Sequence, residues 1–167
     1  MANFNLDVTL KKALEEYEKR DALDMARKTG TNFKDNRFYF DFLNSPVEIG
    51  YPDGTAVFQD TQEKLDLIAQ ILLLHYLVHA GGSPLTGKNI SFKELPGGSI
   101  YIEPFTNRCI RPLIFLFGKD PKGFQTAAEQ CGGIKQNFGD ISYCFKALPN
   151  IPVTLVLWAE DDEFPAN

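Results

Sequence analysis

The last sixteen residues place the strongest constraint on how this chain can fold. A run of six β-favouring residues, Val153–Trp158, is followed almost at once by four consecutive carboxylates, Glu160–Glu163. Such a run predicts a buried strand. The carboxylates must reach water or a cation, because unpaired buried charges are energetically costly. The sequence therefore predicts a core strand that ends abruptly at the protein surface.

Length and composition predict one α+β domain that spans residues 1–167. A chain of 167 residues buries roughly 70% of the surface that its unfolded form exposes, which is enough for one sizeable core. Hydrophobic residues make up 44% of the chain, and this fraction, with 14 Phe and 6 Tyr, excludes disorder. The net charge of −5 and the lack of a Lys/Arg run argue against a nucleic-acid partner.

Targeting and cysteine patterns point to an ordinary intracellular protein. The N-terminus lacks the basic and apolar regions of a signal peptide. The longest apolar stretch, residues 68–78, contains Gln70 and His75 and is too short to cross a bilayer. The three cysteines are widely spaced without a Cys-x-x-Cys pair, which is typical of reduced thiols. We therefore expect a cytoplasmic protein with no membrane partner, no metal and no cofactor.

Hydrophobic periodicity and capping signals predict packed helices and mostly antiparallel strands. Asp60 followed by Glu63 resembles a capping box and predicts a long helix that ends at Gly81. The link of residues 148–152 is too short for a parallel crossover, so the last two strands are expected to be antiparallel. Further helices are expected within residues 10–17, 21–30, 106–117 and 121–131, and strands at 38–43, 47–51, 55–58, 99–102, 141–147 and 153–158.

An irregular segment, Ser83–Gly98, is expected to follow the long helix. Long loops are often functional, but a loop that simply covers the core fits equally well. The overlapping stretch Gly82–Asn89 matches a P-loop up to Lys88, and then has Asn89 where Ser or Thr would hold magnesium. Because this stretch also follows a helix and does not open one, we expect no nucleotide to bind there.

The chain has two histidines, His75 and His79, and both lie on the predicted long helix. Residues four apart share one helix face, a geometry in which two imidazoles can bind one metal. Tyr76 occupies the position where a zinc protease has its general base, and no third ligand can be named. The alternative is a structural role on a face that packs against the sheet, with hydrogen bonds to the backbone.

The carboxylates Asp161, Asp162 and Glu163 are the second candidate site. Such a group can coordinate a hard cation or provide a general acid and a general base. The alternative is a solvated turn, because adjacent side chains on an extended segment point to opposite faces.

Several ordered blocks resemble a known family. They are Leu73–Ala80, Pro84–Phe92, Leu95–Gly98, Leu116–Gly118 and Leu148–Pro165. Together they are similar to the bacterial and archaeal family catalogued as domain of unknown function 3786, over residues 22–166. The resemblance implies a protein of anaerobes that works near redox or one-carbon metabolism. It also implies that relatives continue beyond Pro165, so this chain is expected to be either a natural short form or a truncated one.

Two hypotheses for function follow. The first is an accessory or binding domain that recognises a small molecule or a protein partner through the Gly81–Gly98 loop and the Trp158–Phe164 segment. The second is a small metal-assisted enzyme that uses His75 and His79 with one or more of the carboxylates Asp161, Asp162 and Glu163. The candidate site residues are His75, His79, Lys88, Trp158, Asp161, Asp162 and Glu163.

The Val153–Trp158 strand also bears on assembly. An open strand edge or an exposed apolar face on this strand predicts a homodimer, because a second copy can satisfy both. If the strand lies inside the sheet, a monomer is expected.

Overall fold

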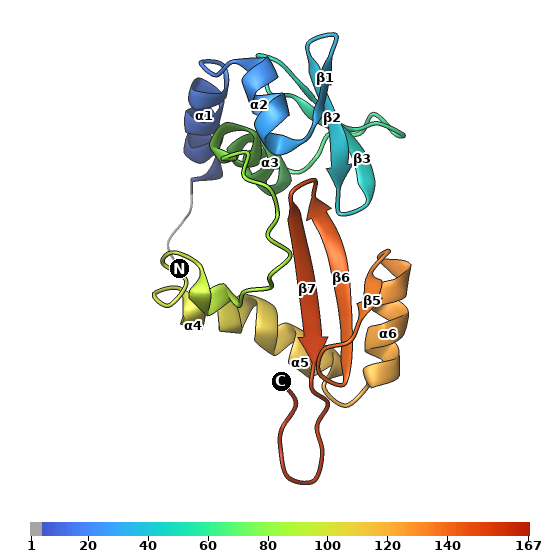
Figure 1. Cartoon of the computed structure of the whole chain (residues 1–167). Helices are drawn as coiled ribbons and strands as arrows, with labels where there is room; N and C mark the ends of the chain where they lie inside the picture. Colours follow the sequence, from blue (N-terminus) through green and yellow to red (C-terminus); the bar gives the residue numbers. More distant parts are fainter. Residues whose placement is uncertain (1–4) are drawn as a thin grey trace. The chain divides into compact units, whose positions relative to one another are not determined.

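A computed structural model describes residues 5–167 of the chain. Its contacts divide the chain into two compact units, Met1–Pro84 with Lys146–Ile151, and Leu85–Phe145 with Pro152–Asn167. Helices and antiparallel sheets make up the structure, which confirms the α+β class (Figure 1). The single domain expected over residues 1–167 stays a prediction.

The first unit contains a four-stranded antiparallel meander. Its strands β1 (Asn32–Lys34), β2 (Arg37–Phe42), β3 (Ser45–Gly50) and β4 (Ala56–Phe58) are neighbours in chain order. In β2 the side chains of Phe38 and Phe40 are buried, whereas Arg37 and Asp41 are exposed. This alternation follows from the two-residue period of a strand, and it turns one face of the meander toward the core. Phe38 pairs with Ile49 across the sheet, and Phe40 pairs with Val47.

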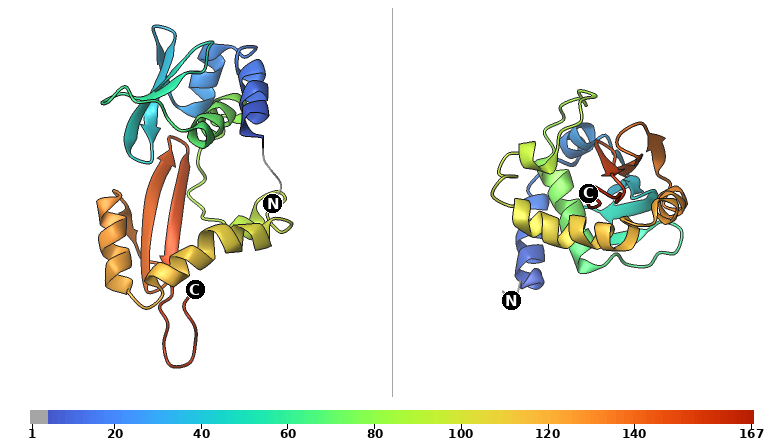
Figure 2. Two further views of the ribbon diagram at one scale, coloured as in Figure 1. Left: turned by 180° about the vertical axis from the view of Figure 1, so that it is seen from behind. Right: turned by 90° about the horizontal axis from the view of Figure 1, so that it is seen from below.

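Three helices pack on that face: α1 (Leu6–Tyr17), α2 (Ala22–Thr29) and α3 (Leu67–His79) (Figures 1 and 2). The Asp21 carboxylate accepts the Asp24 N–H at the start of α2, and Gly30 ends that helix in the left-handed conformation, with φ 68°. The fully buried side chains of this core include Tyr17, Phe38, Val47, Ile49, Leu73, Leu74 and Leu77.

The predicted start of the long helix is wrong. The helix α3 begins at Leu67, and the Asp66 carboxylate accepts the Ala69 N–H at 2.8 Å. The chain before it turns back onto β4, where the Leu65 N–H donates to the Ala56 carbonyl. This backbone bond and the burial of Leu65 outweigh the local capping signal at Asp60 and keep that stretch out of the helix.

The first unit also contains residues 146–151, a turn between two strands. Leu148 joins the core of this unit. The buried Tyr76 hydroxyl donates to the Thr29 carbonyl at 2.6 Å and accepts the Asn150 N–H at 3.2 Å. The Asn150 side-chain amide donates to the Lys28 carbonyl. The last carbonyls of α2 therefore receive donors from α3 and from the turn, which satisfies groups that a helix end leaves unpaired.

The second unit packs helix α6 (Pro121–Gln130) against a sheet of order β5 (Ile134–Gln136), β6 (Ile141–Leu148) and β7 (Ile151–Leu157). Asp120 caps α6 by accepting the Gly123 N–H at 2.8 Å, and the helix expected within residues 121–131 is confirmed. The buried residues of this core are Phe124, Ala128, Tyr143 and Leu157. β7 is an outer strand of the sheet and does not lie inside it. The prediction that residues 153–158 form a buried core strand is therefore wrong: the strand forms, but only Leu157 is buried, because an edge strand is covered less than an inner one.

A second helical segment in this unit runs through α4 (Ile102–Phe105), the π-helical turn η2 (Thr106–Ile110) and α5 (Arg111–Phe117). The helix expected over residues 106–117 is confirmed, but the strand expected at residues 99–102 is wrong. Successive turn bonds, Ile100 N–H to the Gly97 carbonyl and Tyr101 N–H to the Gly98 carbonyl, wind this stretch into α4. Before α4 lies one further short helix, η1 (Phe92–Glu94), of 3-10 type.

The Tyr76 hydroxyl is expected to contribute measurably to stability. Tyr76→Phe leaves the buried Thr29 carbonyl without its donor, so the free energy of unfolding should fall by about 1–3 kcal/mol. The matched control is Tyr39→Phe, because the Tyr39 hydroxyl makes no hydrogen bond within residues 5–167. Urea unfolding measures both variants. Equal stability of the two would contradict the bridging role of Tyr76.

Candidate functional site

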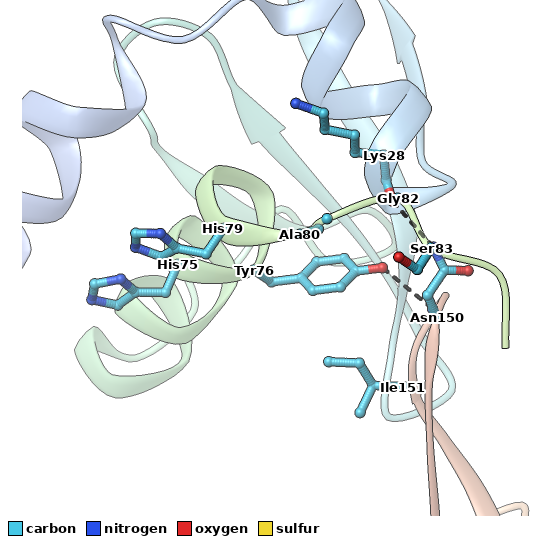
Figure 3. A pocket seen from close by; sticks show the side chains of 10 residues that line it. Lys28, His75, Tyr76, His79, Ala80, Gly82, Ser83, Asn150 and Ile151 are labelled. Atoms are coloured by element: carbon cyan, nitrogen blue, oxygen red, sulfur yellow. Dashed lines mark hydrogen bonds between the residues drawn. The ribbon is translucent and has the colours of Figure 1, made fainter. Parts of the chain in front are cut away.

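The first unit contains an open pocket of about 370 Å³ beside the end of α3 (Figure 3). Four parts of the chain meet there: the end of α2, the last turns of α3, the extended segment after it and the turn of residues 149–150. The lining residues are Lys28, His75, Tyr76, His79, Ala80, Gly81, Gly82, Ser83, Asn150 and Ile151.

His75 and His79 line one side of this pocket with parallel rings. Their ring centroids lie 5.3 Å apart with an interplanar angle of 17°. The expectation that this helix face packs against the sheet is wrong, because both histidines are exposed and Ile68 on the same stripe is 66% exposed. α3 is apolar on nearly every side, so hydrophobic spacing cannot indicate which side is buried. The His79 Nε2 lies 3.6 Å from a Glu16 carboxylate oxygen of α1.

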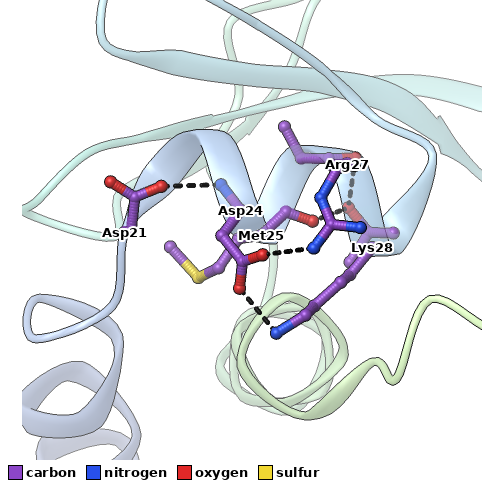
Figure 4. Close-up of polar contacts among 7 residues, drawn as sticks. Asp21, Asp24, Met25, Arg27 and Lys28 are labelled. Carbon is purple, nitrogen blue, oxygen red and sulfur yellow. Dashed lines mark hydrogen bonds and ion pairs between the residues drawn. The ribbon is translucent and has the colours of Figure 1, made fainter.

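The polar side chains of the pocket are one ammonium, two imidazoles, two hydroxyls and one amide, and no Asp or Glu is among its lining residues. Lys28 contributes an ammonium group that pairs with Asp24 at 2.5 Å, and Arg27 pairs with the same carboxylate at 2.6 Å (Figure 4). Hydrogen bonds from Lys28 and then Arg27 lower the pKa of Asp24. The Asp24 carboxylate therefore pairs with two cations, and these three side chains together carry a net charge of +1.

The segment after α3 adds backbone donors to the rim of the pocket. Within residues 5–167, the N–H groups of Gly81, Gly82 and Ser83 donate no hydrogen bond to the chain. Gly82 has φ +75°, and a Cβ there would lie 3.0 Å from the Lys28 side chain. Only glycine adopts this conformation without strain, so Gly82 determines the path of the backbone beside Lys28.

The predicted acidic residues form a turn in the second unit. The Asp161 carboxylate accepts the N–H groups of Glu163 at 2.9 Å and Phe164 at 2.7 Å. These bonds, the Phe164 one first, lower the pKa of Asp161, because they stabilise its charged form. Trp158 and Asn167 exchange two backbone hydrogen bonds and close the loop. The solvated turn is thus the arrangement found, with every carboxylate of this segment exposed.

Lys88 lies on the irregular exposed chain that precedes η1. Within the described part of the chain, no ion pair joins Lys88 to the carboxylates of residues 160–163. The stretch Gly82–Asn89 follows α3 and leads into irregular chain, so the strand, loop and helix of a P-loop are not formed. The structure therefore brings His75 and His79 together, and places Trp158 beside the acidic turn.

Among residues 5–167, no three His, Cys, Asp or Glu side chains lie close enough together to hold an ion. In the same part of the chain, no helix has the length and apolar character needed to cross a membrane.

Sequence reasoning missed a second pocket, of about 290 Å³, in the second unit. Phe92 of η1 stacks on Phe105 of α4 with ring centroids 3.9 Å apart and an angle of 2°. Arg108 and Cys109 come from the π-helical turn, and π-helical turns are frequent at functional sites. The only signal in the sequence was the presence of aromatic residues on both sides of the Gly97–Gly98 break.

Comparison with known families identifies the family of the chain. Residues 21–167 match the family model described as Domain of unknown function (DUF3786). The chain belongs to this family, as the resemblance of its sequence blocks predicted. No curated protein gives a match, and no solved structure gives one.

Gly82 is expected to be intolerant of a side chain. Gly82→Ala places a Cβ at φ +75° and against Lys28, so the free energy of unfolding should fall by about 1–2 kcal/mol. Gly81→Ala is the control, because a Cβ there meets nothing within 4 Å. Chemical denaturation compares the two. A loss at Gly81 as large as that at Gly82 would contradict the assignment.

The Asp161 carboxylate is expected to titrate below the ordinary aspartate pKa of 3.8. Its bonds to two N–H groups stabilise the turn above that pH, and this contribution is lost as the pH falls through the lowered pKa. NMR of the side-chain carboxyl carbon measures the midpoint. The Phe164 amide should shift at the same pH in the wild type and lose that transition in Asp161→Asn. A midpoint at or above the ordinary value would contradict the turn geometry.

Proposed function

We propose that this protein is a binding domain that holds a small molecule in the pocket beside α3. The observation that carries the proposal is the composition of the lining. Imidazole, ammonium, amide and hydroxyl groups surround an apolar patch of Tyr76 and Ile151, and no carboxylate is included. Ligand sites typically combine an apolar surface with a few convergent polar groups.

The lining favours a ligand that carries a carboxylate or a phosphate. The chain as a whole has a net charge of −5, yet this pocket gathers Lys28, His75 and His79. Lys28 pairs with Asp24 and His79 lies 3.6 Å from Glu16, so an anionic ligand would share these groups with the two carboxylates. The three backbone N–H groups of Gly81–Ser83 add donors of the kind that bind anions in backbone concavities.

A protein partner, a cytoplasmic location and a link to anaerobic redox or one-carbon metabolism stay predictions from the sequence. The metal-assisted enzyme stays the alternative. The contact between His79 and Glu16 favours it, because a carboxylate that orients an imidazole is a common feature of general bases.

The test is a binding titration followed by NMR. Protein labelled at its histidine and asparagine side chains is titrated with matched small molecules: a dicarboxylate, a phosphate monoester, and neutral and cationic analogues of similar size. The anions are expected to shift the His75, His79 and Asn150 signals and leave the Trp158 indole unchanged.

A double variant, His75→Ala with His79→Ala, should weaken that binding by tenfold or more. Lys11→Ala on exposed α1 is the control, and its binding should equal that of the wild type. Shifts caused equally by neutral and cationic analogues would contradict the anion preference. If the ligands shift only NMR signals of the second unit, the pocket beside α3 is not the binding site.

A further inference from the structure

Charge is distributed unevenly along this acidic chain. Residues 85–117 contain four Lys or Arg and two Asp or Glu, a net charge of +2, whereas the other residues of the chain sum to −7. One of those two carboxylates is occupied locally, because Glu94 accepts hydrogen bonds from Ser91. The helical segment α4 to α5, with the loop before it, is thus a cationic region.

The same region exposes large apolar side chains. No residue of α4, η2 or α5 is buried, and Phe115 is 88% exposed. Within residues 5–167, Arg108 takes part in no ion pair, and it lies beside the stacked Phe92 and Phe105. Phe92 and Phe105 are partly exposed, and aromatic residues and arginine are both enriched at protein interfaces. Monomeric proteins rarely leave a large apolar patch open to water.

The chain also carries a segment of complementary chemistry, the acidic loop Trp158–Phe164. It presents exposed carboxylates between two exposed aromatic side chains, with Phe164 67% accessible. Glu160 pairs with Lys119 at 3.1 Å, and Asp161 is engaged by the turn. Asp162 and Glu163 remain available to a cation outside the loop.

The loop cannot reach Arg108 of its own chain. The Glu160 N–H donates to the Gly118 carbonyl, and Ala166 packs at Gly118, so the loop is held at the end of α5. Arg108 lies ten residues earlier on the helical segment, which is about 15 Å at 1.5 Å per residue. The loop also extends away from α4 in both side views (Figures 1 and 2).

We propose that the acidic loop of a second copy docks on this region. Phe164 enters the pocket of Phe92 and Phe105, and Asp162 pairs with Arg108. A two-fold axis makes the contact reciprocal, so that each copy offers one loop and one pocket, and the result is a closed dimer. This interface lies in the second unit and is separate from the pocket beside α3.

A charge swap tests the proposal. The mass by light scattering after size exclusion should rise from 18.8 kDa toward twice that value at micromolar concentration, and less so at high salt. Arg108→Glu and Asp162→Arg should each weaken the dimer by tenfold or more. Mixed in equal amounts, the two variants should recover it, since one contact is then native and the other has its charges exchanged.

Control variants on α1, Lys11→Glu and Glu15→Arg, should leave the dimer unchanged, and circular dichroism verifies that all variants fold. The recovery in the mixture also shows that neither charge reversal simply unfolds the protein. A wild type that stays at 18.8 kDa would overturn the proposal. So would a dimer that survives both charge reversals. If that surviving dimer is lost in Val153→Pro, the open edge of β7 is the interface instead.

Discussion

The arrangement of the first unit depends on one buried hydroxyl group. Tyr76 lies on α3, donates to the end of α2 and accepts from the turn at Asn150, so three segments far apart in the sequence meet at one oxygen atom. Burial raises the pKa of Tyr76, so the hydroxyl keeps the proton that it donates. The same helix carries the stacked His75 and His79, and Lys28 and Asn150 complete the pocket. The hydrogen bonds of the Tyr76 hydroxyl thus join the core segments and also position the side chains that line the pocket.

The two units differ in how much of their apolar surface is buried. The first unit covers one face of its meander with three helices and buries residues from all three helices and from β2, β3 and β4. The second unit has a core of few buried residues, and its segment α4 to α5 leaves Phe115 and Leu116 exposed. The second unit therefore buries less apolar surface to offset the conformational entropy that the chain loses on folding. A partner that covers this segment would supply the missing burial.

Much of the fold follows from local rules. The alternation in β2, the caps at Asp21 and Asp120 and the left-handed Gly30 could all be predicted, because each depends on neighbours within a few residues. The acidic turn could also be predicted, since four adjacent carboxylates cannot be buried. By contrast, Asp60 and Asp66 both offer a helix start in sequence, and only the backbone pairing of Leu65 with β4 selects the second.

The sequence by itself determined most of the element types, the exposed acidic end and the family. Only the tertiary structure decided which face of α3 meets water, because a helix that is apolar all round carries no periodic signal. Only the tertiary structure paired Tyr76 with Asn150 across 74 positions, or stacked Phe92 on Phe105. Such contacts depend on how separate elements pack, and no local propensity specifies them. For that reason, His75 and His79 could be named from the sequence, whereas the pocket that they line could not.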